Sequence, residues 1–274
     1  MRRHARTTGP QCNIYVVAEP EPIVDAVLPP RQVPPNAGVP AAWISLVEVF
    51  LCSGFPSQLG LSLLLVAVGF SSTDGSGLSF RFVVWLSVLD TVVVLGLVGL
   101  FLRARGESVR DVLIGPAAIV PEAWRGLALL PLVFLVVIGG GLLLRHVAPY
   151  LHNVADNPLQ AMLDSPVRLA MFAVVVVVAG GLREEVQRAF ILHRFRHDLG
   201  GVGVGLVVFS VAFGMGHVVQ GYDAAILTGL LGLLWGLVYV VRRSIVAPVV
   251  SHSLFNLTEL AIFHYASRAG LLGS

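Results

Sequence analysis

Long apolar runs occupy most of the chain beyond residue 41 and limit the folds that it can adopt. A helix needs about 20 mostly apolar residues to cross the hydrocarbon core of a bilayer. Seven stretches satisfy this requirement, near residues 42–70, 82–102, 126–144, 167–197, 203–219, 223–241 and 245–263. The sequence therefore predicts an all-α, polytopic transmembrane helix bundle of seven spans, or eight if the long first run, which contains Pro56, forms two helices.

The overall composition favours the same class. Charged residues make up only 12% of the chain and hydrophobic residues 56%, whereas soluble domains carry about 25% charged residues. The formal net charge is +2, which gives no reason to expect a nucleic-acid partner. The partner that the composition does imply is the lipid bilayer.

The first 41 residues differ from the rest of the chain. They contain eight prolines between Pro10 and Pro40, with scattered charges and no sustained apolar period. We expect residues 1–41 to form a flexible tail and residues 42–274 to form the transmembrane domain. Arginines cluster in the loops on the side of the tail, which predicts a cytoplasmic N-terminus. The polar stretch 103–116 is expected to lie at the membrane interface.

The fourth span contains an unusual polar segment, Gly-Gly-Leu-Arg-Glu-Glu-Val-Gln-Arg-Ala-Phe, at residues 180–190. Charged side chains at membrane depth are costly, so they usually face the interior of a bundle and mark a functional site. The structural alternative is an ion pair between Glu184 and Arg188, which are four residues apart on a helix.

Further polar residues lie on two other spans. His217 lies in the fifth predicted span, whereas His252 and Asn256 lie one helical turn apart in the seventh. A turn near Gly200 joins the fourth and fifth spans. If these spans are antiparallel, Glu184 and His217 lie at the same depth, about 24 Å from that turn. The pattern predicts one buried polar chamber shared by the three spans.

Such a chamber has two chemical interpretations. A glutamate beside a histidine can activate water, and its pKa can approach neutrality in a buried site, while a His–Asn pair can donate hydrogen bonds to a developing oxyanion. Alternatively, two histidines and a glutamate can hold zinc with one position open to water. No serine or cysteine is placed as a nucleophile, so hydrolysis by activated water is the reaction we expect.

The order of these motifs resembles the CAAX-protease and bacteriocin-processing family. These are intramembrane endopeptidases related to the type II CAAX prenyl protease and to the abortive-infection-like proteins. The resemblance covers roughly residues 165–260, and residues 242–256 are similar to the family's third motif in full. The residues that carry the resemblance are Glu184, Glu185 and Arg188, then Phe213 and His217, then His252 and Asn256.

The resemblance implies a role for each of these residues. Glu184 would be the general base, His217 its partner on the water, and His252 and Asn256 the oxyanion donors, with Glu185 as a supporting acid. Arg188 and Phe213 would support the site. In a metal-dependent version, with zinc as the candidate, the ligands would be Glu184, His217, His252 and Asn256. The resemblance leaves open whether there is any cofactor.

One residue departs from the family's first motif. The family pattern is Glu-Glu-x-x-x-Arg, whereas Arg188 stands one position early. A shift of one residue rotates a side chain by about 100° around a helix, so the family pattern leaves the role of Arg188 open.

The function expected from the resemblance is hydrolysis of a peptide bond at or within the membrane. The substrate would be a peptide or a membrane protein, with a lipidated one as the family's best-known case, and the location a bacterial inner membrane. A non-catalytic scaffold or immunity-type protein with the same fold is the alternative. A proton-coupled transporter is a third hypothesis, although only one polar half is visible in the sequence.

Overall fold

The described structure, a computed structural model, covers residues 40–75, 77–155 and 157–270 and is almost entirely helical. The predicted tail therefore lies outside the described residues, apart from its last two positions, which begin the first helix. The only described strands are β1 (Thr73–Asp74) and β2 (Gly77–Leu78), which form a small antiparallel hairpin with Thr73 opposite Leu78. The predicted all-α class is confirmed.

Among the described residues, five helical segments are long and apolar enough to cross a membrane. They are α4 (Phe80–Ala104), α6 to α7 (Ile119–Phe134 and Gly140–Val147), α8 to α9 (Pro166–Val175 and Glu184–Asp198), α11 (Tyr222–Arg242) and α12 (Val246–Arg268). Short π-helical segments, Leu135–Gly139 and Val176–Arg183, join the halves of the second and third of these spans. The chain is an integral, multi-pass membrane protein.

A broken helix forms a sixth candidate span. The first apolar run forms α2 (Pro40–Cys52) and α3 (Phe55–Ala67), which bend by 43° at the break and together pass as one span. Gly54 adopts a positive φ of 81° at the bend and Pro56 lies in the first turn of α3, where its missing N–H needs no helical partner. The predicted break at Pro56 is confirmed.

The predicted number of seven or eight spans is wrong, because the described residues provide five or six. The difference lies in α10 (Val202–Met215), which has only 14 residues. At about 1.5 Å per residue it is about 21 Å long, whereas the hydrocarbon core is about 30 Å thick. The apolar sequence continues past Met215, but the helix does not.

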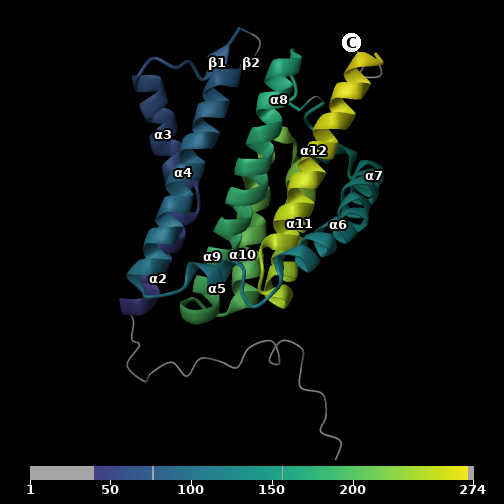
Figure 1. The fold of residues 1–274 in the computed structure, drawn as a ribbon. Coiled ribbons are helices and arrows are strands. Elements are labelled where there is room, and N and C mark those ends of the chain that lie inside the picture. The colour runs from purple at the N-terminus through teal and green to yellow at the C-terminus, as the bar shows by residue number, and fades with distance from the viewer. Residues whose placement is uncertain (1–39, 76, 156, 271–274) are drawn as a thin grey trace, which may run out of the picture. The chain divides into compact units, whose positions relative to one another are not determined.

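The remaining helix, α5 (Val109–Leu113), is short and lies in the polar stretch that joins α4 to α6. Figure 1 shows the long helices side by side. The β1–β2 hairpin, the beginning of α8 and the end of α12 lie at one end of them, and α5 and the loop between α9 and α10 lie at the other.

The distribution of polarity is the reverse of that in a soluble protein. Large apolar side chains are exposed along the outer helix faces, as at Val92, Leu142 and Val211, whereas Arg188, Arg194 and other charged residues are fully buried. An apolar exterior suits the hydrocarbon of a bilayer, and charges within a membrane protein are expected to face the bundle interior. The charged residues of the described spans therefore hold the interior together or line a site.

Candidate functional site

A cavity of about 440 Å³ opens among α4, α8, α11, α12 and the segment that precedes α8. This volume is within the usual range of ligand pockets. The polar residues that line it come from distant parts of the sequence: Ser87, Asn157, Gln160, Glu184, His217, Gln220, Thr228, His252, Asn256 and Glu259. The structure thus brings four of the five predicted catalytic residues to one cavity, and Glu185 is the exception.

Glu184 is positioned by the π-helical segment that precedes it. Val176–Arg183 winds as a π-helix between α8 and α9, and π-turns within α-helices occur frequently at functional sites. Its two glycines allow α12 to approach closely. A Cβ atom on Gly180 would lie 2.7 Å from Nδ2 of Asn256, and one on Gly181 would collide with Ser253. The apolar sequence pattern carries no sign of this π-helical segment.

His252 lies between two carboxylates. Its Nδ1 is 2.9 Å from Oε1 of Glu185, and its Nε2 is 3.8 Å from Oε2 of Glu184. Because a carboxylate can only accept, Nδ1 carries the proton in the first contact. The second distance exceeds that of a direct hydrogen bond, so Nε2 and the Glu184 carboxylate both remain available to a molecule in the cavity.

Trp235 fixes the plane of the His252 ring. The two rings stack with centroids 3.9 Å apart at an interplanar angle of 18°, and the indole Nε1 donates to Oγ of Ser251 at 2.8 Å. Trp235 is fully buried apart from the face that lines the cavity. No sequence motif indicates this role, because an indole at this position of an apolar span is typical of ordinary packing.

Glu185 lies behind the cavity. It is only 1% exposed, does not line the cavity, and pairs with Arg188 as well as with His252. In this position it can orient His252 but cannot contact a substrate. The structural alternative predicted from the sequence, a pair between Glu184 and Arg188, is not the pair that forms, since Arg188 contacts Glu185.

Arg188 is enclosed by aromatic rings. Its guanidinium lies 4.9 Å from the ring centroid of Phe213, 5.1 Å from that of Phe209 and 5.6 Å from that of Trp235. These cation–π contacts are worth more in a desolvated site than at a surface. Arg188 therefore holds Glu185 from behind, which gives a physical role to the residue that departs from the family motif.

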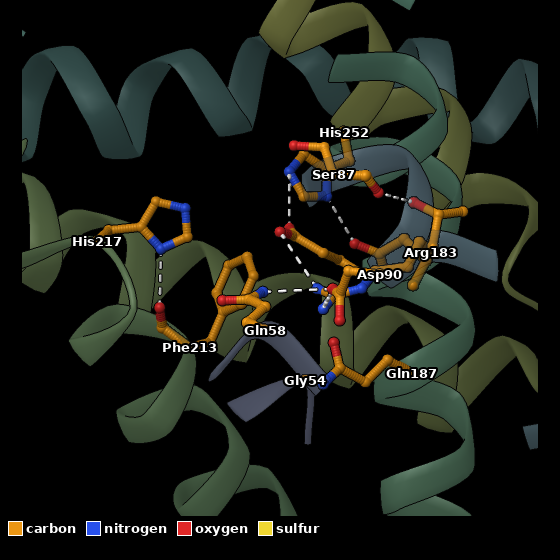
Figure 2. A network of polar contacts seen from close by, with 12 residues as sticks. Gly54, Gln58, Ser87, Asp90, Arg183, Gln187, Phe213, His217 and His252 are labelled. Atoms are coloured by element: carbon orange, nitrogen blue, oxygen red, sulfur yellow. Dashed lines mark hydrogen bonds and ion pairs between the residues drawn. The ribbon is translucent and has the colours of Figure 1, made fainter. Parts of the chain in front are cut away.

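His217 lies on the other side of the cavity, beyond the end of α10 and not within a span as predicted. Its Nδ1 is 2.8 Å from the carbonyl oxygen of Phe213, which fixes the proton on Nδ1 and leaves Nε2 unprotonated in the neutral ring. The ring also lies against that of Phe213, with centroids 5.0 Å apart. Figure 2 shows His217 and the Phe213 carbonyl set apart from His252, and no hydrogen bond or ion pair between described residues joins His217 to Glu184.

Asn256 completes the set one turn beyond His252 on α12. Its Nδ2 lies 3.5 Å from the carbonyl oxygen of Val176, at the beginning of the π-helical segment. This contact is at the limit of a hydrogen bond. The amide therefore stays available to an acceptor in the cavity.

Arg183 connects Glu184 to α4 and, through Asp90, to the broken helix formed by α2 and α3. Arg183 pairs with Asp90 of α4, which also accepts from Ser57 and, at 3.3 Å, from Nε2 of Gln58. Nη1 of Arg183 lies 4.0 Å from Oε1 of Glu184. Figure 2 shows Gln58, Asp90 and Arg183 grouped beneath His252. Asp90 thus makes interhelical contacts.

Other buried acids lie at the opposite end of α9, in what we call the α2–α9 network. Arg194 donates to Oε2 of Glu48 and to Oε2 of Glu107, both at 2.6 Å, and Arg105 donates to Oε1 of Glu48 at 2.9 Å and to Oδ2 of Asp198 at 2.8 Å. Every acid in this network has an arginine partner. Its members are Glu48, Arg105, Glu107, Arg194 and Asp198.

Glu107 is the acid of this network that lies outside the membrane-spanning helices. Burial raises the pKa of its carboxyl, but hydrogen bonds from His193 and Arg194, together with their charges, outweigh burial and lower the pKa to about 2. His193 approaches the carboxylate at 3.0 Å. Glu107 therefore stays ionised down to strongly acidic pH.

The donor atoms of the cavity do not form a metal site in this conformation. Among the described residues there is no group of three or more His, Cys, Asp or Glu side chains that could hold a metal ion. The four residues predicted as ligands for the metal-dependent version line one cavity but do not converge on one point. We therefore derive no step through a metal.

Comparison with known proteins gives a single match. The model of the family described as type II CAAX prenyl endopeptidase Rce1-like matches residues 166–258. No curated protein and no solved structure matches the chain. The matched region contains α8 to α12 up to two residues past Asn256, and so includes all seven residues on which the predicted resemblance rested. That resemblance is confirmed: residues 166–258 of this membrane protein are similar to the type II CAAX prenyl endopeptidases of the Rce1-like family.

Proposed function

We propose that the protein is an intramembrane endopeptidase in which Glu184 activates a water molecule for attack on a peptide bond. The observation that carries the proposal is that Glu184, His217, His252 and Asn256, which come from three separate segments, line one cavity of about 440 Å³. The similarity of residues 166–258 to CAAX prenyl endopeptidases supports the same reaction class.

In this mechanism Glu184 accepts a proton from a water molecule, with Nε2 of His217 accepting a second hydrogen bond from that water. The water oxygen forms a bond to the carbonyl carbon of the substrate. The resulting oxyanion accepts hydrogen bonds from Nδ2 of Asn256 and from Nε2 of His252, and such donors typically lower a barrier by a few kcal/mol. For Nε2 to donate while Nδ1 donates to Glu185, His252 is the imidazolium in this step, with the Glu185 carboxylate as its counter-ion. Glu184 then returns its proton to the amine as the C–N bond breaks.

Glu185 and Trp235 act as positioning residues. Glu185 holds Nδ1 of His252 and so turns Nε2 toward the cavity, and Trp235 holds the plane of the ring. Preorganised donors of this kind cost no reorganisation when charge develops. We further propose that the substrate is a lipidated peptide or membrane protein, that the N-terminus is cytoplasmic and that the membrane is a bacterial inner membrane.

The test is cleavage of quenched fluorescent peptides by the full chain reconstituted in lipid vesicles. The peptides form pairs with and without a prenylated cysteine. Glu184→Gln keeps the shape of the side chain and removes the base, so its rate should fall by at least about 100-fold, the usual contribution of a general base. Asp164→Asn is the control, because Asp164 is exposed and pairs with Arg168 away from the cavity.

Two outcomes of this assay would change the proposed mechanism. If Glu184→Gln cleaves as fast as the wild type, Glu184 is not the base and the mechanism is wrong. If EDTA abolishes cleavage and added zinc restores it, then Glu184, His217, His252 and Asn256 act through a metal, and the site must rearrange to bind it.

A further inference from the structure

One carboxylate in the cavity has no part in the reaction described above. Glu259 lines the cavity and is exposed to it, three residues beyond Asn256 and seven beyond His252 on α12. Within the described part of the chain, no hydrogen bond or ion pair is made by its side chain. It also lies just outside residues 166–258, the region that matches the family model.

An unpaired carboxylate is unusual in this molecule. Glu259 lies within α12, one of the spanning helices, where ionisable residues are rare and normally pair or mark a path for a substrate. The buried acids of the described residues have arginine or histidine partners, such as Arg183 for Asp90, Arg242 for Glu122 and His152 for Asp223. No arginine or lysine lines the cavity, so the structure offers Glu259 no cation there.

The spacing along α12 fixes how far Glu259 is from the reacting bond. Seven residues of helix between His252 and Glu259 correspond to about 10 Å. An extended peptide advances about 3.3–3.6 Å per residue, so about three substrate residues cover this distance. Among the other polar side chains that line the cavity, Asn157 and Gln220 are joined by a hydrogen bond of 3.3 Å. Their amides can bind the polar backbone of such a peptide.

We propose that Glu259 forms a subsite for a cationic side chain, lysine or arginine, of the peptide substrate, about three residues from the bond that is cut. The inference rests on the proposed function, since it assumes that the cavity holds a peptide. A cation there would form an ion pair with the one carboxylate in the cavity that lacks a partner. Charge-assisted hydrogen bonds of this kind are roughly twice as strong as neutral ones. Glu259 would thus select substrates, while Glu184 cleaves them.

The experiment measures binding, so that it does not depend on cleavage. Full-length Glu184→Gln, which should not cut, is titrated with fluorescent peptides in which arginine or its neutral isostere citrulline is scanned over each position. One arginine position should bind at least about ten-fold more tightly than its citrulline counterpart. This preference should vanish in the double variant Glu184→Gln/Glu259→Gln and persist in the matched control Glu184→Gln/Asp164→Asn.

A charge reversal provides a further arm. Glu184→Gln/Glu259→Arg should prefer glutamate to glutamine at the same peptide position. The proposal is overturned if the parent variant does not distinguish arginine from citrulline, if Glu259→Gln leaves the preference intact, or if no peptide binds. Cleavage by the wild type is measured separately, so the subsite and the proposed hydrolase can fail independently.

Discussion

The two ends of α9 use buried acids in different ways. In the α2–α9 network each carboxylate is held by arginine at hydrogen-bond distance, as Glu48 is held by Arg105 and Arg194. At the cavity, Glu184 has Arg183 only at 4.0 Å and His252 only at 3.8 Å, and Glu259 has no partner among the described residues. Acids that are paired hold helices together, whereas acids left without a close partner are available to a water or a substrate.

The largest effect on stability is expected at Arg194, which is fully buried between Glu48 and Glu107. Arg194→Met would leave two carboxylates without this partner, and breaking a buried ion pair typically costs about 3–5 kcal/mol. We expect about 3 kcal/mol here, because Arg105 still holds Glu48. Denaturant unfolding in detergent measures this loss in the free energy of unfolding.

Arg103→Met is the matched control, because Arg103 is exposed and such substitutions usually change stability by less than about 0.5 kcal/mol. Equal stability of the Arg194 and Arg103 variants would contradict a structural role for the α2–α9 network.

Acid should weaken the same network. The pKa of Glu107 is lowered from 4.5 to about 2 in the folded state, so its contribution to stability is fully present above pH 4.5 and is lost as the pH falls toward 2. The wild type should therefore lose stability over this range more steeply than Glu107→Gln. If the melting temperatures of the wild type and Glu107→Gln fell in parallel as the pH was lowered, Glu107 would not be the source of this acid sensitivity.

A smaller effect is expected at Trp235. Trp235→Phe keeps an aromatic ring against His252 but removes the hydrogen bond from Nε1 to Ser251, which is worth about 1 kcal/mol. If Trp235 positions His252, kcat should fall while KM changes little. A purely structural role would lower the melting temperature without changing kcat.

The smallest effect is expected from one added methyl group. A Cβ on Gly180 would lie 2.7 Å from Nδ2 of Asn256, whereas a Cβ on Gly203 of α10 would meet nothing within 4 Å. Gly180→Ala should shift Asn256 and slow cleavage. Gly203→Ala, in the first turn of α10, should leave cleavage unchanged. Equal rates for the two variants would mean that Asn256 tolerates displacement or takes no part.

Much of the site could be predicted from the sequence, because charged and polar residues stand out within apolar runs. The grouping of Glu184 with His217 followed from equal distances along two helices from the Gly200 turn. This estimate assumed a helix as far as His217, whereas α10 ends two residues earlier, at Met215. The difference is small, and Glu184 and His217 still line the same cavity. Hydropathy measures apolar length and not helical length, and for this reason the number of spans was wrong.

Other features could not be predicted because they depend on which face of a helix points inward. Glu184 and Glu185 are adjacent, yet only the first lines the cavity. The direction of each depends on the π-helical segment Val176–Arg183, which changes the register of the helix that follows. Trp235 and Glu259 carry no motif, and only their position beside the cavity identifies them.

The most direct measurement compares Glu184→Gln with Glu48→Gln, the same substitution at an acid without a close partner and at an acid held by two arginines. Cleavage rate and melting temperature would be measured for both in the same vesicles. The predicted result is that Glu184→Gln loses cleavage with its melting temperature nearly unchanged, while Glu48→Gln has a clearly lowered melting temperature. Cleavage by Glu184→Gln at the wild-type rate would contradict the catalytic role of Glu184. A melting temperature of Glu184→Gln lowered as much as that of Glu48→Gln would contradict it as well.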